Sequence, residues 1–133
     1  MNRKIKILQI NVTANQGSTG RIAEGIGLAI QAKGNESWIA YGRHANRSSS
    51  NLLRIGSRFN CFEHGLETRI FDNHGLASKH ATYIFLNEID RIKPDLIHLH
   101  NIHGYYLNYK LLFHYIQSKK IALAPRNWTL DKV

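Results

Sequence analysis

The stretch from Lys93 to Tyr106, KPDLIHLHNIHGYY, constrains the fold of this chain more than any other. Pro94 has no backbone N–H and restricts the residue before it, so a helix that precedes it must end here. Residues 95–101 then form a short strand whose apolar residues, Leu96, Ile97 and Leu99, fall on both faces. A strand of that kind is typical of the centre of a parallel sheet. The sequence therefore predicts an α/β fold built around this strand.

The N-terminal third of the chain predicts a strand, a turn-rich loop and a helix, in that order. The strand covers residues 5–12 and the loop covers residues 13–19. We expect Ser18 or Thr19 to cap the helix, which ends at Gly34.

Two glycines inside this first helix, Gly25 and Gly27, indicate that it packs closely on the sheet, because each costs the helix about 1 kcal/mol relative to alanine. The helical spacing predicts the following inward-facing positions: Ile22, Ala23, Ile26, Ala29 and Ile30.

The rest of the chain continues the alternation of strands and helices. We expect residues 42–51 to form an exposed, mobile loop, because they are polar and basic and contain a serine run. The second well-marked helix has the apolar positions Ala81, Ile84, Phe85, Ile89 and Ile92. The other predicted elements are strands at 37–41, 52–55 and either 121–123 or 127–130, and helices at 58–71, 78–92 and 107–118.

The predicted fold is a single Rossmann-like domain over residues 1–133, with a mostly parallel sheet and helices on both faces. No apolar run is long enough to cross a membrane, and no signal peptide is visible. The one cysteine, Cys61, excludes an internal disulfide and fits a reducing compartment. We expect a cytoplasmic protein.

The chain carries a formal net charge of +9 at pH 7. Such a charge attracts anionic partners over long range, among them membrane headgroups and phosphorylated small molecules. The basic residues are dispersed and form no dense run of the kind found in nucleic-acid-binding arms. The charge alone does not choose a partner: peripheral contact with the anionic inner face of the membrane is one interpretation, and an ordinary basic, solvated surface is the other. We do not expect nucleic acid as a partner.

The segment GSTGR, formed by Gly17, Ser18, Thr19, Gly20 and Arg21, joins the first strand to the first helix. In doubly wound folds, backbone N–H groups and the helix dipole bind anions at this position. A cation in the first helical turn opposes the dipole, so the presence of Arg21 favours an anionic ligand. The alternative is that the glycines serve only a tight turn. The segment matches neither GxGxxG nor the GxxxxGK[ST] phosphate loop.

The crest that follows the central strand is polar, and in open α/β sheets ligands bind beyond the carboxyl ends of such strands. We expect His98 to be packed and hydrogen-bonded, and we expect His100, Asn101 and His103 to present polar atoms to a cleft. A metal site is the alternative interpretation of the three histidines, but no cysteine or carboxylate accompanies them. Tyr105 and Tyr106 offer flat surfaces suited to sugar rings, or simple packing.

Three stretches taken together resemble a known family: ILQINVTANQGSTGRIAEGIG, WIAYGR and PDLIHLHNIHGYYLNYKLLFHYI. They resemble the N-terminal half of family 4 glycosyltransferases of the GT-B fold, in particular the bacterial polysaccharide-building group related to colanic acid synthesis enzymes. The likeness covers nearly the whole chain, up to about Lys120. IHLHNIHGYYLN is specific to the group, whereas the glycine loop is common to many GT-B enzymes.

The resemblance implies that a sugar moves, with retention, from a nucleotide-sugar donor to a growing and often lipid-linked glycan acceptor in cell-surface polysaccharide synthesis. In the family the N-terminal half forms the acceptor side, and the C-terminal half binds the donor and carries paired glutamates. We therefore expect no catalytic residue, metal or cofactor in this chain. The expected substrate-binding residues are those of the GSTGR segment together with Arg43, His100, Asn101, His103, Tyr105 and Tyr106.

One departure from the family pattern concerns the fifth strand, which typically reads like VWTLHD. Here Asn127-Trp-Thr-Leu130 is followed by Asp131 and Lys132, so the family's cleft histidine has no match. We expect a truncated domain that is inactive alone and meets a nucleotide-sugar donor only with a C-terminal domain. A non-enzymatic basic module that binds anions or membranes is the alternative.

Overall fold

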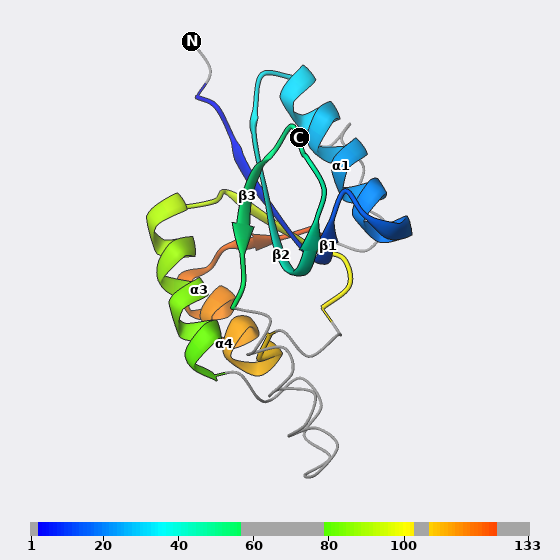
Figure 1. The fold of residues 1–133 in the computed structure, drawn as a ribbon. Helices are drawn as coiled ribbons and strands as arrows, with labels where there is room; N and C mark the ends of the chain where they lie inside the picture. Colours follow the sequence, from blue (N-terminus) through cyan, green and yellow to red (C-terminus); the bar gives the residue numbers. More distant parts are fainter. Residues whose placement is uncertain (1–2, 57–78, 103–106, 125–133) are drawn as a thin grey trace.

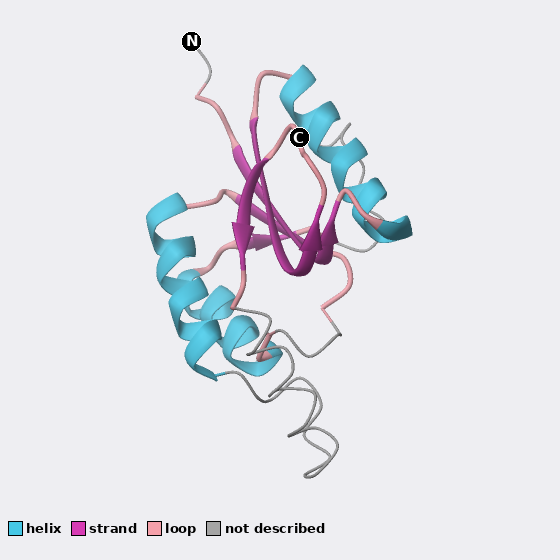
Figure 2. Cartoon of the chain, viewed as in Figure 1, coloured by secondary structure: helices cyan, strands magenta, loops and turns pink. Residues whose placement is uncertain are grey.

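The computed structural model describes residues 3–56, 79–102 and 107–124 (Figure 1). Its centre is a sheet of five strands, each parallel to its neighbours (Figure 2). The spatial order is β3-β2-β1-β4-β5. The strands are β1 (Lys6–Ala14), β2 (Glu36–Ala45), β3 (Asn51–Arg54), β4 (Leu96–Leu99) and β5 (Ala122–Leu123). This confirms the predicted Rossmann-like parallel sheet.

Helices cover both faces of the sheet, as the sequence predicts. They are α1 (Gly17–Ala32), α3 (Lys79–Ile92) and α4 (Tyr109–Lys119). Figure 1 shows α1 on one side of the sheet, with α3 and α4 next to each other on the other side. The two faces bury different residues, because successive side chains of a strand point in opposite directions.

The face under α3 and α4 holds the main apolar core. Leu8 and Ile10 of β1 and Ile97 of β4 are buried there with side chains of both helices, among them Phe85, Ile89, Leu112 and Ile116. On the α1 face, Ala14 and Ile39 pack on Ala23 of α1. The remaining β1 side chains on the α1 face include the polar residues Gln9 and Asn11, which are fully buried. Burial of polar groups on one face is the feature that shapes the candidate site.

The first helix begins earlier than predicted. It starts at Gly17, its N-cap is Gln16, and the Gln16 side chain makes no capping hydrogen bond. The expectation that Ser18 or Thr19 caps it is therefore wrong. The strand before it extends to Ala14, so the turn between the two elements is short, and Asn15 and Gly17 adopt positive φ angles of 50° and 69° to make it.

Only one of the two helix glycines that were expected to pack closely does so. A Cβ atom on Gly27 would lie 2.4 Å from Ser50 Oγ and 3.0 Å from Ser37 Oγ, whereas one on Gly25 would have nothing within 4 Å. The prediction for Ile22 is also wrong, since 56% of that residue is exposed. Gly27 lies over the sheet, and Gly25 faces away from it.

Residues 42–51, predicted to be an exposed, mobile loop, are largely exposed but are not all loop. Residues 42–45 belong to β2, and Ser50 is buried. Glu24 of α1 accepts hydrogen bonds from the Ser48 hydroxyl and, at 2.9 Å and 3.0 Å, from the Ser49 N–H and hydroxyl. Burial acts to raise the pKa of Glu24, and these hydrogen bonds outweigh it and lower the pKa. The serine run is therefore fastened along α1.

The C-terminal elements agree with their predictions in type and nearly in extent. The side chain of Asn108 caps α4 by accepting from Leu111 N at 3.1 Å, and Lys119 lies in its last turn. The expectation that Ile84 faces the core is wrong, because 52% of the residue is exposed. The predicted helix at 58–71 and the alternative last strand at 127–130 lie outside the described residues. None of the helices within the described ranges is long and apolar enough to cross a membrane.

The contrast between the two helix glycines predicts opposite effects of the same substitution. Gly27→Ala pushes a methyl group into the hydrogen-bonded pair Ser37 and Ser50, and it should lower the free energy of unfolding by about 1–3 kcal/mol. Gly25→Ala meets open space and should raise it by up to about 1 kcal/mol, the difference in helix propensity. Urea unfolding of both variants measures this. Equal effects of the two substitutions would contradict the close contact at Gly27.

Candidate functional site

The candidate site lies at the point of the sheet where the order in which the chain adds strands reverses. From β1 the chain proceeds outward through β2 and β3, and it then crosses to the other side of β1 to form β4 and β5. Ligands of open α/β sheets bind at such a switch point, beyond the carboxyl ends of the two diverging strands. Here those strands are β1 and β4, which pair in parallel from Ile7 and Leu96 to Ile10 and Leu99.

Asn11 connects three chain segments at this edge. Its Nδ2 donates to Thr13 O at 2.8 Å and to Thr19 Oγ1 at 3.3 Å, and its Oδ1 accepts from Asn101 N at 3.2 Å. The residue is fully buried, so these bonds replace the water that its amide loses on folding. One amide therefore links the end of β1, the first turn of α1 and the residue after β4.

Gln9, two positions earlier on the same face, makes the second connection. Its Nε2 donates to Ala23 O of α1 at 2.9 Å, and its Oε1 lies 2.7 Å from Nε2 of His100. Gln9 is fully buried, and His100 is partly buried. The side chain of His100 is thus fixed against β1 by an amide that is itself fixed against α1.

The two strand histidines lie next to each other on this face, with ring centroids 4.3 Å apart. His98 is buried, as expected, and burial lowers its pKa. Burial and, to a lesser extent, the nearby His98 ring lower the pKa of His100 to about 4. Burial and the neighbouring His98 ring both disfavour the protonated, charged form of the imidazole, so His100 is neutral at physiological pH.

The GSTGR segment forms the first turn of α1 at the same edge of the sheet. Thr19 contacts Asn11, as described above, and Gly20 lies against β1, where a Cβ atom would be 2.7 Å from Thr13 Oγ1. Gly17, Ser18 and Arg21 are exposed. Because no side chain of the N-cap residue binds the first-turn N–H groups, the geometry is compatible with an anion there. Anion binding by this turn stays a prediction.

The structure brings only some of the expected residues together. Thr19, His100 and Asn101 meet through Gln9 and Asn11. Arg43 is exposed near the carboxyl end of β2, beside the same sheet edge. The remaining three expected residues, His103, Tyr105 and Tyr106, lie outside the described residues.

Gln9 and Asn11 are absent from the set of residues expected from the sequence, although the sequence contains a signal for them. In ILQINV the two polar residues are two positions apart within an apolar strand, which places both on one face. Polar side chains on a buried strand face need partners, and they often mark a place where a helix or ligand approaches.

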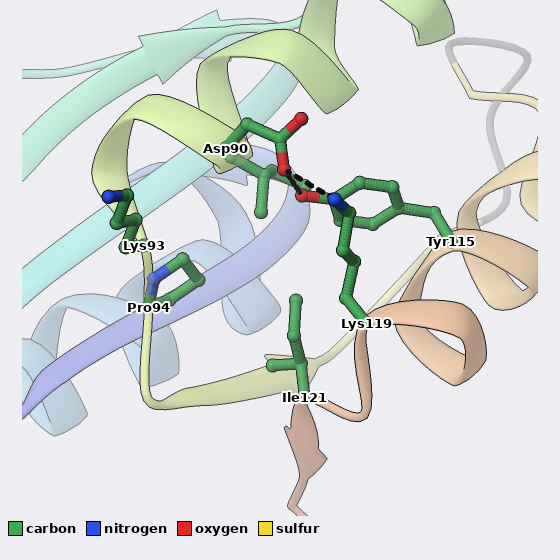
Figure 3. A pocket seen from close by; sticks show the side chains of 7 residues that line it. Asp90, Lys93, Pro94, Tyr115, Lys119 and Ile121 are labelled. Carbon is green, nitrogen blue, oxygen red and sulfur yellow. Dashed lines mark hydrogen bonds and ion pairs between the residues drawn. The ribbon is translucent and has the colours of Figure 1, made fainter.

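A hollow of about 280 Å³ lies at the opposite, amino edge of the sheet, where α3 and α4 end (Figure 3). Its wall is a cluster in which the Tyr115 hydroxyl donates to Asp90 and Lys119 Nζ lies 3.8 Å from the same carboxylate, while Lys93 points away. Burial and the hydrogen bond to Asp90 raise the pKa of Tyr115. This hollow lies away from the switch point of the sheet, so we place the candidate site at the carboxyl edge instead.

Among the residues that the structure describes, no three His, Cys, Asp or Glu side chains are arranged to hold a metal ion. Comparison of the chain with protein-family models, with curated proteins and with solved structures gives no match.

The lowered pKa values predict that the protein loses stability in mild acid. The folded state binds a proton at His100 only near pH 4, whereas an ordinary histidine of the unfolded chain binds it near pH 6.5. The free energy of unfolding should therefore fall as pH drops from about 6.5 towards 4, with His98 acting in the same direction. Urea unfolding of the wild type at pH 7 and at pH 5 measures the loss.

The variant His100→Gln should show a smaller loss between the two pH values, because glutamine does not titrate. His114→Gln, at an exposed position of α4, is the matched control for removing a histidine elsewhere. A wild-type protein whose stability is the same at pH 7 and pH 5 would contradict the placement of both strand histidines.

Proposed function

We propose that this chain forms the acceptor side of a retaining glycosyltransferase that builds bacterial cell-surface polysaccharide. The donor nucleotide sugar would be bound by a separate donor-binding domain. The observation that carries the proposal is the network in which Gln9 and Asn11 join β1 to His100 and Asn101 at the switch point of the sheet. It is supported by the resemblance of the sequence to family 4 glycosyltransferases.

The chemistry of the network suits a sugar. The buried amides of Gln9 and Asn11 hold three partly buried residues, Thr19, His100 and Asn101. These three carry a hydroxyl, a neutral imidazole and an amide, which hydrogen-bond without carrying a charge. A sugar presents several hydroxyl groups, each able to donate and to accept. The carboxyl edge of the sheet holds these groups on rigid strands, which is a requirement for recognising a ligand by its hydrogen-bonding pattern.

The net charge of +9 supports an acceptor at an anionic surface. Each basic residue close to an anionic membrane contributes about 1 kcal/mol to binding there. A protein in the cytoplasm that extends lipid-linked glycans would meet them at the inner face of the membrane. The basic exterior would first bring the protein to the membrane, and the neutral site would then bind the sugar of the acceptor.

Saccharide binding to the purified chain tests the proposal. In a titration with the methyl glycosides of glucose, galactose and N-acetylglucosamine, followed by amide NMR shifts, at least one sugar should perturb Thr19, Asn11 and Asn101. The hollow lined by Tyr115 and Lys119 serves as the internal control and should not respond.

A parallel titration with vesicles of anionic phospholipid separates the proposal from the alternative, a basic anion- or membrane-binding module. Vesicle binding together with no response to any sugar would favour the module. Sugar-induced shifts confined to the hollow would move the site to the amino edge of the sheet.

A further inference from the structure

The orientation of the Gln9 amide is fixed by its partner on α1. Ala23 O is a carbonyl oxygen and can only accept, so the Gln9 atom 2.9 Å from it must be the NH₂ group. The other end of the amide, Oε1, then faces His100.

This orientation determines the protonation of the His100 ring. An amide oxygen cannot donate, so the 2.7 Å contact requires that His100 Nε2 carry the hydrogen. In a neutral imidazole the other nitrogen, Nδ1, is then an acceptor. The neutral form is favoured by burial and by the His98 ring, the titratable group that contacts His100 among the described residues.

We propose that Gln9 is a positioning residue that fixes the Nε2–H tautomer of His100, so that Nδ1 accepts a hydrogen bond from a hydroxyl group of the acceptor sugar. The identity of the ligand as a sugar rests on the proposed function, whereas the tautomer does not. The recognised group must be a donor, because the lone pair on Nδ1 repels a deprotonated phosphate or carboxylate oxygen, which can only accept. This contact therefore selects a neutral hydroxyl, in contrast to the anion expected at the first turn of α1.

The tautomer is tested without any ligand. Long-range ¹H–¹⁵N spectra of the full chain distinguish a protonated from an unprotonated ring nitrogen, and at pH 7 His100 should show protonated Nε2 and unprotonated Nδ1. A protonated Nδ1 at pH 7, in either the neutral or the charged ring, would overturn the inference whatever the protein binds.

Two substitutions at Gln9 separate a positioning role from a structural one. Gln9→Leu removes the acceptor and should give His100 a mixture of the two tautomers. Gln9→Glu supplies a carboxylate, which should favour the charged ring and raise the midpoint of His100 titration by about one to three pH units. An unchanged His100 spectrum in both variants would overturn the role of Gln9.

The hydroxyl contact is tested with a methyl glycoside that binds the wild type, and with inorganic phosphate as the anionic probe. His100→Leu should weaken glycoside binding by about three- to tenfold, the effect of one hydrogen bond. His100→Gln can keep both a donor to Gln9 and a free acceptor, and it should recover part of the affinity. His114→Leu, the same substitution at an exposed position of α4, is the control and should bind like the wild type.

The outcomes separate the two proposals. Glycoside binding that is equal in the wild type and His100→Leu would overturn the contact and leave the proposed function standing. Phosphate that shifts the His100 ring signals more than any glycoside does would overturn the selection of a neutral group. If no glycoside binds the wild type, the proposed function fails, and the sugar contact fails with it.

Discussion

A buried amide must find partners for both its donor and its acceptor, and Gln9 does so by joining three elements of this fold. Its donor binds the backbone of α1 and its acceptor binds His100, so the distance between α1 and the carboxyl end of β4 is set by one side chain on the strand between them. If α1 moved away, the amide would lose a partner in a dry environment, at a cost of about 1–3 kcal/mol. The position of the helix and the state of the histidine are therefore coupled.

The two faces of the sheet differ in chemistry. Under α3 and α4 the contacts are apolar and non-directional, as in an ordinary core. On the α1 face the contacts are largely directional, with Gln9 and Asn11 on the strand, and Glu24 holding the serine run between β2 and β3. Gly27 allows α1 to lie this close to the sheet, because a Cβ atom there would lie 2.4 Å from Ser50 Oγ and 3.0 Å from Ser37 Oγ. A face built of oriented hydrogen bonds fixes the positions of its polar atoms more exactly than an apolar face does.

The sequence predicts the type of each described element well and its surroundings less well. Pro94 and the apolar residues on both faces after it are local signals, and they correctly predict β4 as an interior strand that pairs with β1 and β5, although the middle strand of the sheet is β1. Glu24 and Ser48 are 24 residues apart, and nothing in the local pattern shows that they meet, so the serine run was expected to be mobile. Ile22 and Ile84 fit the helical period yet are exposed, because periodicity does not show which flank of a stripe the sheet covers. Gln9, by contrast, could have been identified from the sequence, because a polar residue within an apolar strand needs a hydrogen-bond partner.

The net charge and the neutral network act over different distances, which reconciles them within one protein. Charge on the exterior attracts anionic surfaces over roughly 10 Å at moderate salt and carries no information about sugar structure. Hydrogen bonds act only at contact, and their direction is fixed by groups such as Gln9 Oε1 and Asn11 Oδ1 that cannot reverse without losing a second partner. A cation at position 100 would weaken this division, since it would attract any anion into the site. Under the proposed function, the burial that keeps His100 neutral separates attraction to an anionic surface from recognition of the sugar.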